Sequence, residues 1–214
     1  MMSHYDARYF EWQSALGRFS GSLNAPIFSA YIRNTDTILD FGCGGGFLLD
    51  SLTARSKLGV EINPSARATA SKLGIDTVAT LDDVPDSQYD VVISNHALEH
   101  TVAPMDIVGK TLVKLKPGGL AIFVVPCERY DTKYVQDSID QHLYTWSPQN
   151  LGNLFCYAGF DIVTVRRVIH RWPPKVDAID RLFGRAFCHA MCRLYGFLRP
   201  KLTQVQIVAR RPPS

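Results

Sequence analysis

The chain has 214 residues, 46% of them hydrophobic, and its 23 basic and 20 acidic side chains give a net charge of +3. This length suits one domain with a substantial core, and so small a charge excess gives no electrostatic ground for nucleic-acid binding. Five cysteines, an odd number in a chain too long to need disulfide staples, indicate a reducing cytoplasmic compartment.

The first thirty residues form a mixed helical and aromatic segment, with aromatic rings at Tyr5, Tyr9, Phe10 and Trp12. The N-terminus lacks the basic start and continuous apolar stretch of a secretory signal. No segment approaches the roughly 18 uninterrupted apolar residues that a membrane-spanning helix needs. We therefore expect a soluble protein.

From Thr37 onward, short β-rich runs alternate with helix-compatible segments. The runs cover residues 37–41, 57–61, 76–80, 89–94 and 120–125. They are apolar nearly throughout, as strands buried on both faces are. One intervening segment has Pro64 near a helix start and Gly74 at its end. The alternation predicts an α/β fold, a doubly wound and mostly parallel sheet with helices on both faces.

The last third of the chain adds two strands to this pattern. After an irregular stretch over 127–146 and a helix over 147–159, a sixth strand is predicted at 161–170 and a seventh at 203–210. The insertion at 171–202 has apolar residues at helical spacing between 177 and 199, which predicts one amphipathic helix. We expect this helix to serve as a lid, as a dimer interface or, ranked last, as an interfacial helix whose arginines contact anionic lipid.

The stretch ILDFGCGGGFLLD, residues 38–50, sets four glycines between two apolar runs. Glycine lets backbone adopt otherwise strained angles and lets a ligand approach the main chain. A phosphate-binding P-loop would need Lys and Ser or Thr where Phe47 and Leu48 stand, and Phe47 also occupies the third glycine position of a dinucleotide fingerprint. These ligand classes are excluded or fit poorly.

What remains is the pattern D-x-G-x-G-x-G at Asp40, Gly42, Gly44 and Gly46, with an acidic residue, Glu61, ending the second strand. A carboxylate at Asp40 suits a ligand that carries an ammonium group. Glu61 offers two oxygens to the two hydroxyls of a ribose. An amino acid joined to a nucleoside describes S-adenosylmethionine. The alternative is a tight strand-to-helix turn in a non-catalytic α/β domain.

Five motifs in order, LDFGCGGGFLL, GVEINPSA, YDVVISNHALEH, LKPGGLAIFVVP and HLYTWSPQNLGNLFCYAGF, resemble those of class I S-adenosylmethionine-dependent methyltransferases, in the group that acts on small molecules. The resemblance runs from about residue 37 to 169, with the last strand at 203–210. It implies a Rossmann-like methyltransferase fold with sheet order 3-2-1-4-5-7-6 and an antiparallel seventh strand. It also implies a single methyltransferase domain over 1–214, in which residues 1–30 fold over the cofactor.

The same resemblance assigns roles to the motif residues. The cofactor S-adenosylmethionine, or its product S-adenosylhomocysteine, would contact residues in four places. These are the glycine loop with its adjacent residues, the acidic residue expected to bind the ribose with the two residues after it, two residues after strand three, and two residues at the end of strand four. These residues are Asp40, Gly42, Cys43, Gly44, Gly46, Glu61, Ile62, Asn63, Thr80, Leu81, Asn95 and His96. After strand three the chain reads Thr80, Leu81, Asp82, which leaves open whether a side chain or only backbone recognises adenine.

The sequence has fewer motifs for the site that binds the methyl acceptor. His142 is the catalytic candidate, because the resemblance puts the acceptor above the ends of strands four and five, and imidazole removes protons near neutral pH. A structural role in fixing the loop is the alternative. His96, Glu99 and His100 have helical spacing, but no further ligand stands nearby in the sequence, so we expect no metal.

The predicted reaction is direct in-line methyl transfer to a small-molecule acceptor, first of all to an oxygen. The expected partners are that acceptor and, if the chain is not a monomer, a second copy of it, with no nucleic acid. The alternative is a non-catalytic S-adenosylmethionine-binding or partner-regulating protein whose amphipathic helix is the interaction surface. A dehydrogenase is a distant third.

Overall fold

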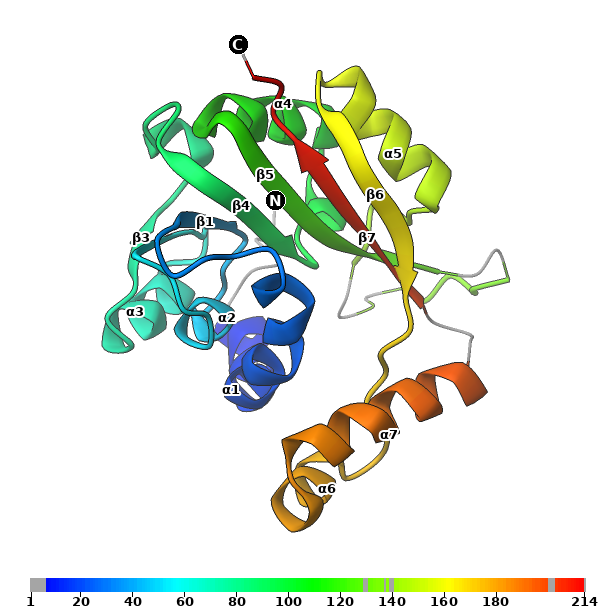
Figure 1. Ribbon diagram of the computed structural model, residues 1–214. Helices are drawn as coiled ribbons and strands as arrows, with labels where there is room; N and C mark the ends of the chain where they lie inside the picture. Colours follow the sequence, from blue (N-terminus) through cyan, green and yellow to red (C-terminus); the bar gives the residue numbers. More distant parts are fainter. Residues whose placement is uncertain (1–6, 129–130, 137, 139–140, 200–202, 214) are drawn as a thin grey trace.

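The structure is a computed structural model that describes residues 7–128, 131–136, 138, 141–199 and 203–213. Its strands form one sheet with the order β3-β2-β1-β4-β5-β7-β6 (Figure 1). The strand bounds are β1 Thr37–Phe41, β2 Ser56–Val60, β3 Asp76–Val78, β4 Tyr89–Asn95, β5 Leu115–Cys127, β6 Asp161–Val168 and β7 Thr203–Arg210. The predicted sheet order is confirmed.

The strands run parallel except for β7, which pairs antiparallel with both β5 and β6. β1 lies at the centre, parallel to β2 on one side and to β4 on the other. The chain leaves β1 towards β2 and β3, then returns across the sheet to β4. In open sheets of this kind ligands bind at the carboxyl ends of the strands on either side of that reversal.

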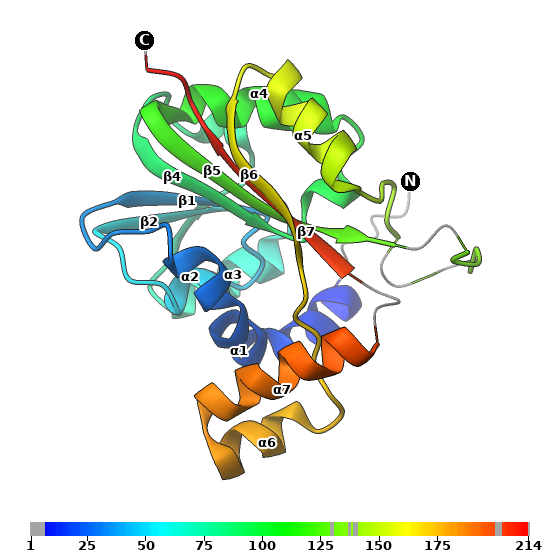
Figure 2. The same cartoon turned by 45° about the vertical axis from the view of Figure 1, so that its right-hand side comes forward.

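Helices cover both faces of the sheet (Figures 1 and 2). One face carries α1 Ala7–Ser29, α2 Phe47–Asp50 and α3 Pro64–Lys72; the other carries α4 Pro104–Lys114 and α5 Pro148–Tyr157. Two single-turn 3-10 helices, η1 Leu81–Asp83 and η2 Leu98–His100, follow β3 and β4. This arrangement is the doubly wound fold that the alternation of runs predicts.

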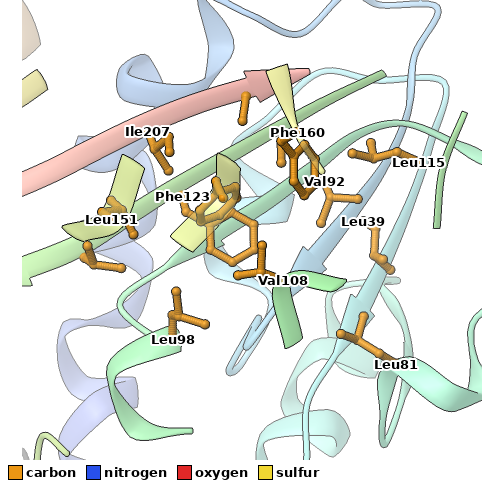
Figure 3. Close-up of a cluster of buried hydrophobic side chains, with 14 of the residues drawn as sticks. Leu39, Leu81, Val92, Leu98, Val108, Leu115, Phe123, Leu151, Phe160 and Ile207 are labelled. Atoms are coloured by element: carbon orange, nitrogen blue, oxygen red, sulfur yellow. The ribbon is translucent and has the colours of Figure 1, made fainter. Parts of the chain in front are cut away.

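Each face of the sheet has its own apolar core. Val92 of β4 and Phe123 of β5 point towards α4 and α5, where they meet Val108 and Leu151 (Figure 3). Ile93, the neighbour of Val92, belongs to the core on the α1–α3 face. Alternate side chains of a strand point to opposite faces, so burial of both faces requires apolar residues at successive positions.

The insertion after β6 differs from its prediction, because it forms two helices. These are α6 Val176–Phe183 and α7 Arg185–Leu198, and the expectation of one amphipathic helix over 177–199 is wrong. Gly184 separates them with φ 81° and ψ 165°, which are not helical angles. Glycine adopts this conformation without a Cβ clash, so the chain turns there. No helix in the described ranges is long and apolar enough to cross a membrane.

Candidate active site

The glycine loop follows β1 and depends on left-handed backbone. Gly42, Gly44 and Gly46 have φ angles of 75°, 54° and 79°, a region that side chains with a Cβ rarely enter. A Cβ on Gly42 would also lie 2.3 Å from the Cβ of Ala97, which follows β4. The loop therefore brings bare main chain to the centre of the sheet, between β1 and β4.

Glu61 joins the loops that follow β1 and β2. Its Oε2 accepts a hydrogen bond from the Gly44 N–H at 2.9 Å, and its Oε1 accepts one from the Asn63 N–H at 2.8 Å. Burial raises the pKa of the Glu61 carboxyl, although these N–H groups and the nearby Arg67 oppose the shift. Arg67 also donates to the Glu61 carbonyl at 2.8 Å. The carboxylate is thus held in one orientation beside the loop.

A cavity of about 410 Å³ lies against Glu61 and the ends of β1, β3 and β4. Of the predicted cofactor residues its lining contains Gly42, Glu61, Ile62, Asn63, Thr80, Leu81 and His96. Asn63 is buried and caps α3 by accepting from the Ser65 N–H at 2.9 Å. Sequence reasoning missed several of the other lining residues, among them Ala97, Thr101, Ile107 and Lys110. The volume and the mixed lining suit a nucleoside.

A second, smaller cavity of about 90 Å³ lies on the other side of Gly42, under α1. It is lined by the predicted residues Asp40, Cys43, Gly44 and Asn95, while Gly46 lies outside both linings. Asp40 is 2% exposed, and burial, with the nearby Glu61, raises the pKa of its carboxyl. Within the described residues its Oδ1 has no hydrogen-bond partner. A buried oxygen without a partner is costly, so a cationic ligand group suits this position.

Helix α1 approaches the glycine loop through two glycines of its own. A Cβ on Gly21 would lie 2.4 Å from the backbone oxygen of Phe47, and one on Gly17 would lie 2.3 Å from the Phe47 ring. Ser20 and Asn24 of the same helix line the smaller cavity. Sequence reasoning missed these residues, although two glycines four apart in a helix are a signal of close packing.

Four aromatic residues near the N-terminus lie outside what the structure describes. They are Tyr5 and the side chains of Tyr9, Phe10 and Trp12. The role of residues 1–30 as a lid therefore stays a prediction. What the structure does define is that Ser20 and Asn24 from this segment reach the smaller cavity.

His142 lies between two carboxylates. Its Nδ1 is 2.6 Å from Oε1 of Glu128, and its Nε2 is 4.0 Å from Oε1 of the fully buried Glu99. The segment around it is tied to η2, because the N–H groups of Leu143 and Tyr144 donate to the Glu99 carbonyl at 2.9 and 3.3 Å. The sequence could not reveal this pairing, which depends on how the irregular stretch folds back.

Glu99, His100 and His142 bring one ligand atom each within 4.8 Å of one another. Two imidazoles and a carboxylate are a donor set that divalent transition metals accept. The sequence groups His96 with Glu99 and His100. In the structure Nδ1 of His96 lies 3.2 Å from Oε1 of Glu99, but the third candidate ligand of the cluster is His142, which is distant in the sequence. The expectation that no metal binds stays a prediction.

Similarity to known proteins identifies the family of this chain. A family model described as "Methyltransferase domain" matches residues 4–165, which is more than half of the chain. A curated "Ubiquinone biosynthesis O-methyltransferase" from Roseobacter denitrificans is 31% identical over 127 residues, covering 52% of this chain and 50% of that protein. The chain thus aligns with about half the length of the curated relatives it matches.

Two solved structures share the fold at low sequence identity. A SAM-dependent methyltransferase from Archaeoglobus fulgidus has a TM-score of 0.67 and 17% identity, covering 96% of this chain and 100% of that one. The cyclase SpnF has a TM-score of 0.64 and 20% identity, covering 95% of this chain and 84% of that one. The second neighbour is named for a different reaction, so the fold alone does not determine the chemistry.

Proposed function

Because the chain belongs to the methyltransferase-domain family, as a class I S-adenosylmethionine-dependent enzyme, we propose that it methylates an oxygen atom of a small-molecule acceptor. The name of its curated relatives supports oxygen as the receiving atom. The observation that carries the proposal is the pair of cavities that meet at Gly42, one suited to a nucleoside and the other ending at the unpartnered Oδ1 of Asp40.

The residues present fit the cofactor. Glu61 stands at the wall of the larger cavity with both carboxylate oxygens held towards the loops, where they can also accept from ribose hydroxyls. Ile62, Thr80 and Leu81 line the larger cavity and would give the adenine an apolar contact and backbone groups. In the smaller cavity the buried Asp40 would hold the amino-acid ammonium group, with Asn95 beside it. Bound there, S-adenosylmethionine supplies a sulfonium-activated methyl group for direct in-line displacement by the acceptor oxygen.

The protein then has to align the acceptor and manage one proton. Positioning of two reactants is worth roughly 7–11 kcal/mol of a reaction barrier. We assign the proton to His142, whose Nδ1 is fixed by Glu128, so that Nε2, which lies 4.0 Å from Oε1 of Glu99, is the nitrogen that exchanges the proton. His100 supports this assignment, because it lines the larger cavity and its ring centroid lies 5.0 Å from that of His142. His142 is thus in contact with the ring of a residue that lines the larger cavity.

The test is release of S-adenosylhomocysteine on mixing the purified protein with S-adenosylmethionine and a panel of phenols, including catechols with an isoprenoid tail. We expect turnover with at least one hydroxylated aromatic and transfer of label from the methyl group to its oxygen. Turnover only with amines or thiols would overturn the oxygen assignment. Binding of S-adenosylhomocysteine without turnover on any acceptor would favour the alternative, a non-catalytic cofactor-binding protein.

A further inference from the structure

A third cavity lies away from the cofactor site and is lined by residues of α1, the end of β6 and α7. Its volume is about 290 Å³, and it shares no lining residue with the two cavities that meet at Gly42. Three arginines line it, Arg166 and Arg167 from β6 and Arg193 from α7. Neither the cofactor site nor the acceptor chemistry uses this group of cations.

Arg166 is positioned by an amide side chain. Its Nε donates to Gln206 Oε1 at 2.8 Å, and the fully buried Gln206 donates in turn to the Ile27 carbonyl of α1 at 2.9 Å. Arg167 follows on β6 opposite Val205 of the α4–α5 core, so its side chain belongs to the other face of the sheet. In the part of the chain that the structure describes, no Asp or Glu lines the cavity, and none forms an ion pair with these three arginines. The planar guanidinium groups of Arg166 and Arg193 match the oxygens of a phosphate.

Two histidines in the same lining are kept neutral by burial. Nε2 of His170 lies 3.2 Å from Nδ1 of His189. Burial, followed by His189 and Arg193, lowers the pKa of His170 to about 4, and burial with nearby arginines also lowers that of His189. Within the described residues Nε2 of His189 is buried without a hydrogen-bond partner. An unsatisfied imidazole nitrogen in the lining calls for one more polar partner, and the neighbouring arginines favour one with negative charge.

Beside the cavity, α6 and α7 expose an apolar surface. It consists of Leu182, Phe183, Phe187, Leu194, Phe197 and Leu198, each between 46% and 75% exposed, and is called the apolar band here. The opposite side of α7 packs on α1 through Cys188 and Cys192. Arg193 of the cavity and Phe197 of the apolar band are one helical turn apart, so the cations and the apolar surface adjoin.

We propose that the cavity binds the phosphate of an anionic phospholipid while the apolar band enters the bilayer surface. Basic amphipathic helices bind lipid through apolar area together with attraction to anionic headgroups. A second copy of this chain would bring the same unpaired arginines against each other, and free phosphate would make no use of the band. Membrane docking goes beyond methyl transfer, and it ranked last among the uses predicted for this insertion.

The experiment is co-sedimentation of the full chain with vesicles of phosphatidylglycerol and phosphatidylcholine, compared with vesicles of phosphatidylcholine alone. We expect binding to the anionic vesicles that weakens as salt rises. Arg193→Gln should lower the partition coefficient about fivefold, Arg167→Gln on the other face of the sheet should change it little, and Phe183→Glu with Phe197→Glu should abolish binding. Tyr157→Glu on α5, where Tyr157 is 88% exposed, is the matched control and should bind as the native chain does.

Affinity for S-adenosylhomocysteine should stay unchanged in every variant, which shows that each has folded and keeps this test separate from that of methyl transfer. Equal binding to both kinds of vesicle would overturn the requirement for an anionic phospholipid. Calorimetric binding of inorganic phosphate without vesicle binding would overturn the lipid as its source. A dimer that Phe183→Glu with Phe197→Glu dissociates, in a chain that ignores vesicles, would assign the band to a second copy.

Discussion

Oε1 of Glu128 and Nδ1 of His142 are 2.6 Å apart, although fourteen positions separate them in the chain. A carboxylate on one ring nitrogen fixes the tautomer and leaves the other nitrogen to exchange a proton with a ligand. Glu128 and His142 form such a pair in the stretch after β5. Their neighbour His100 lines the larger cavity.

Replacing His142 by Ala should lower kcat by about 10²–10⁴, the contribution of a positioned general base, with little change in cofactor affinity. Glu128→Gln should lower kcat less, about tenfold, because the ring remains but loses its orienting charge. Steady-state kinetics with calorimetry of S-adenosylhomocysteine separates the two quantities. If His142→Ala turns over at the native rate, the histidine only fixes the loop.

Asp40→Asn should make the ligand-free protein more stable at neutral pH. Burial and Glu61 raise the pKa of Asp40 in the folded state, so the folded protein holds a proton that the unfolded chain has released. Stability therefore falls as pH rises from the unfolded pKa, near 3.9, through the raised folded value. Thermal melts of both forms across this range should show a gap in Tm that closes as pH falls, with about 2–4 °C for each kcal/mol at this chain length.

The same substitution should weaken S-adenosylmethionine binding, because Asp40 can release its proton and meet the ammonium group as a carboxylate, whereas the amide of Asn stays neutral. A loss of about tenfold or more in affinity is the expected size for a charge-assisted hydrogen bond. S-Adenosyl-containing ligands that lack the amino group serve as the control, since their affinity should hardly change. An equal loss for both ligands would place the ammonium elsewhere.

Gly21→Ala should destabilise the protein and weaken cofactor binding together. The new methyl group would lie 2.4 Å from the backbone oxygen of Phe47, so α1 has to move away from α2. Overpacking of this kind costs about 1–3 kcal/mol. Gly109→Ala on α4 is the matched control, because a Cβ there meets nothing within 4 Å. Denaturant melts that rank the two variants alike would show that the contact between α1 and α2 tolerates the methyl group.

Removal of divalent cations should leave turnover unchanged, because the proposed reaction assigns the proton to His142. Dialysis against EDTA, followed by an assay with and without added Mg²⁺ or Zn²⁺, checks this. An activity lost on dialysis and restored by one ion would instead make Glu99, His100 and His142 a metal centre. In that case Glu99→Gln should abolish the restoration.

The sequence predicted those parts of the fold that burial on both faces controls. The bounds of β1 and β7 agree with their mostly apolar runs, since a strand covered on both sides buries side chains at successive positions. The site was equally predictable where parallel strands end side by side. Asp40 lies near the end of β1, and Glu61 directly follows the parallel neighbour β2, so their carboxylates had to lie at the same edge of the sheet.

Contacts that depend on loop paths were beyond such patterns. Nothing in the spacing of Glu99, Glu128 and His142 shows that the stretch after β5 folds back onto η2. Gly184 also escaped notice, because a single glycine inside a helical repeat is often tolerated and here ends a helix instead. The aromatic and apolar residues of the insertion fit a helical period whichever side they face, so only the structure separates the packed side from the apolar band.

The stretch after β5 is fastened at both of its ends. The Glu128 N–H donates to Thr145 Oγ1 at 2.7 Å, the Trp146 N–H to the Pro126 carbonyl at 3.0 Å, and the Leu143 N–H to the Glu99 carbonyl. We therefore expect that the residues between Glu128 and His142 can be replaced without loosening these hydrogen bonds or the cofactor cavities at Gly42. We further expect that such replacements change the acceptor that the enzyme prefers while cofactor binding is kept.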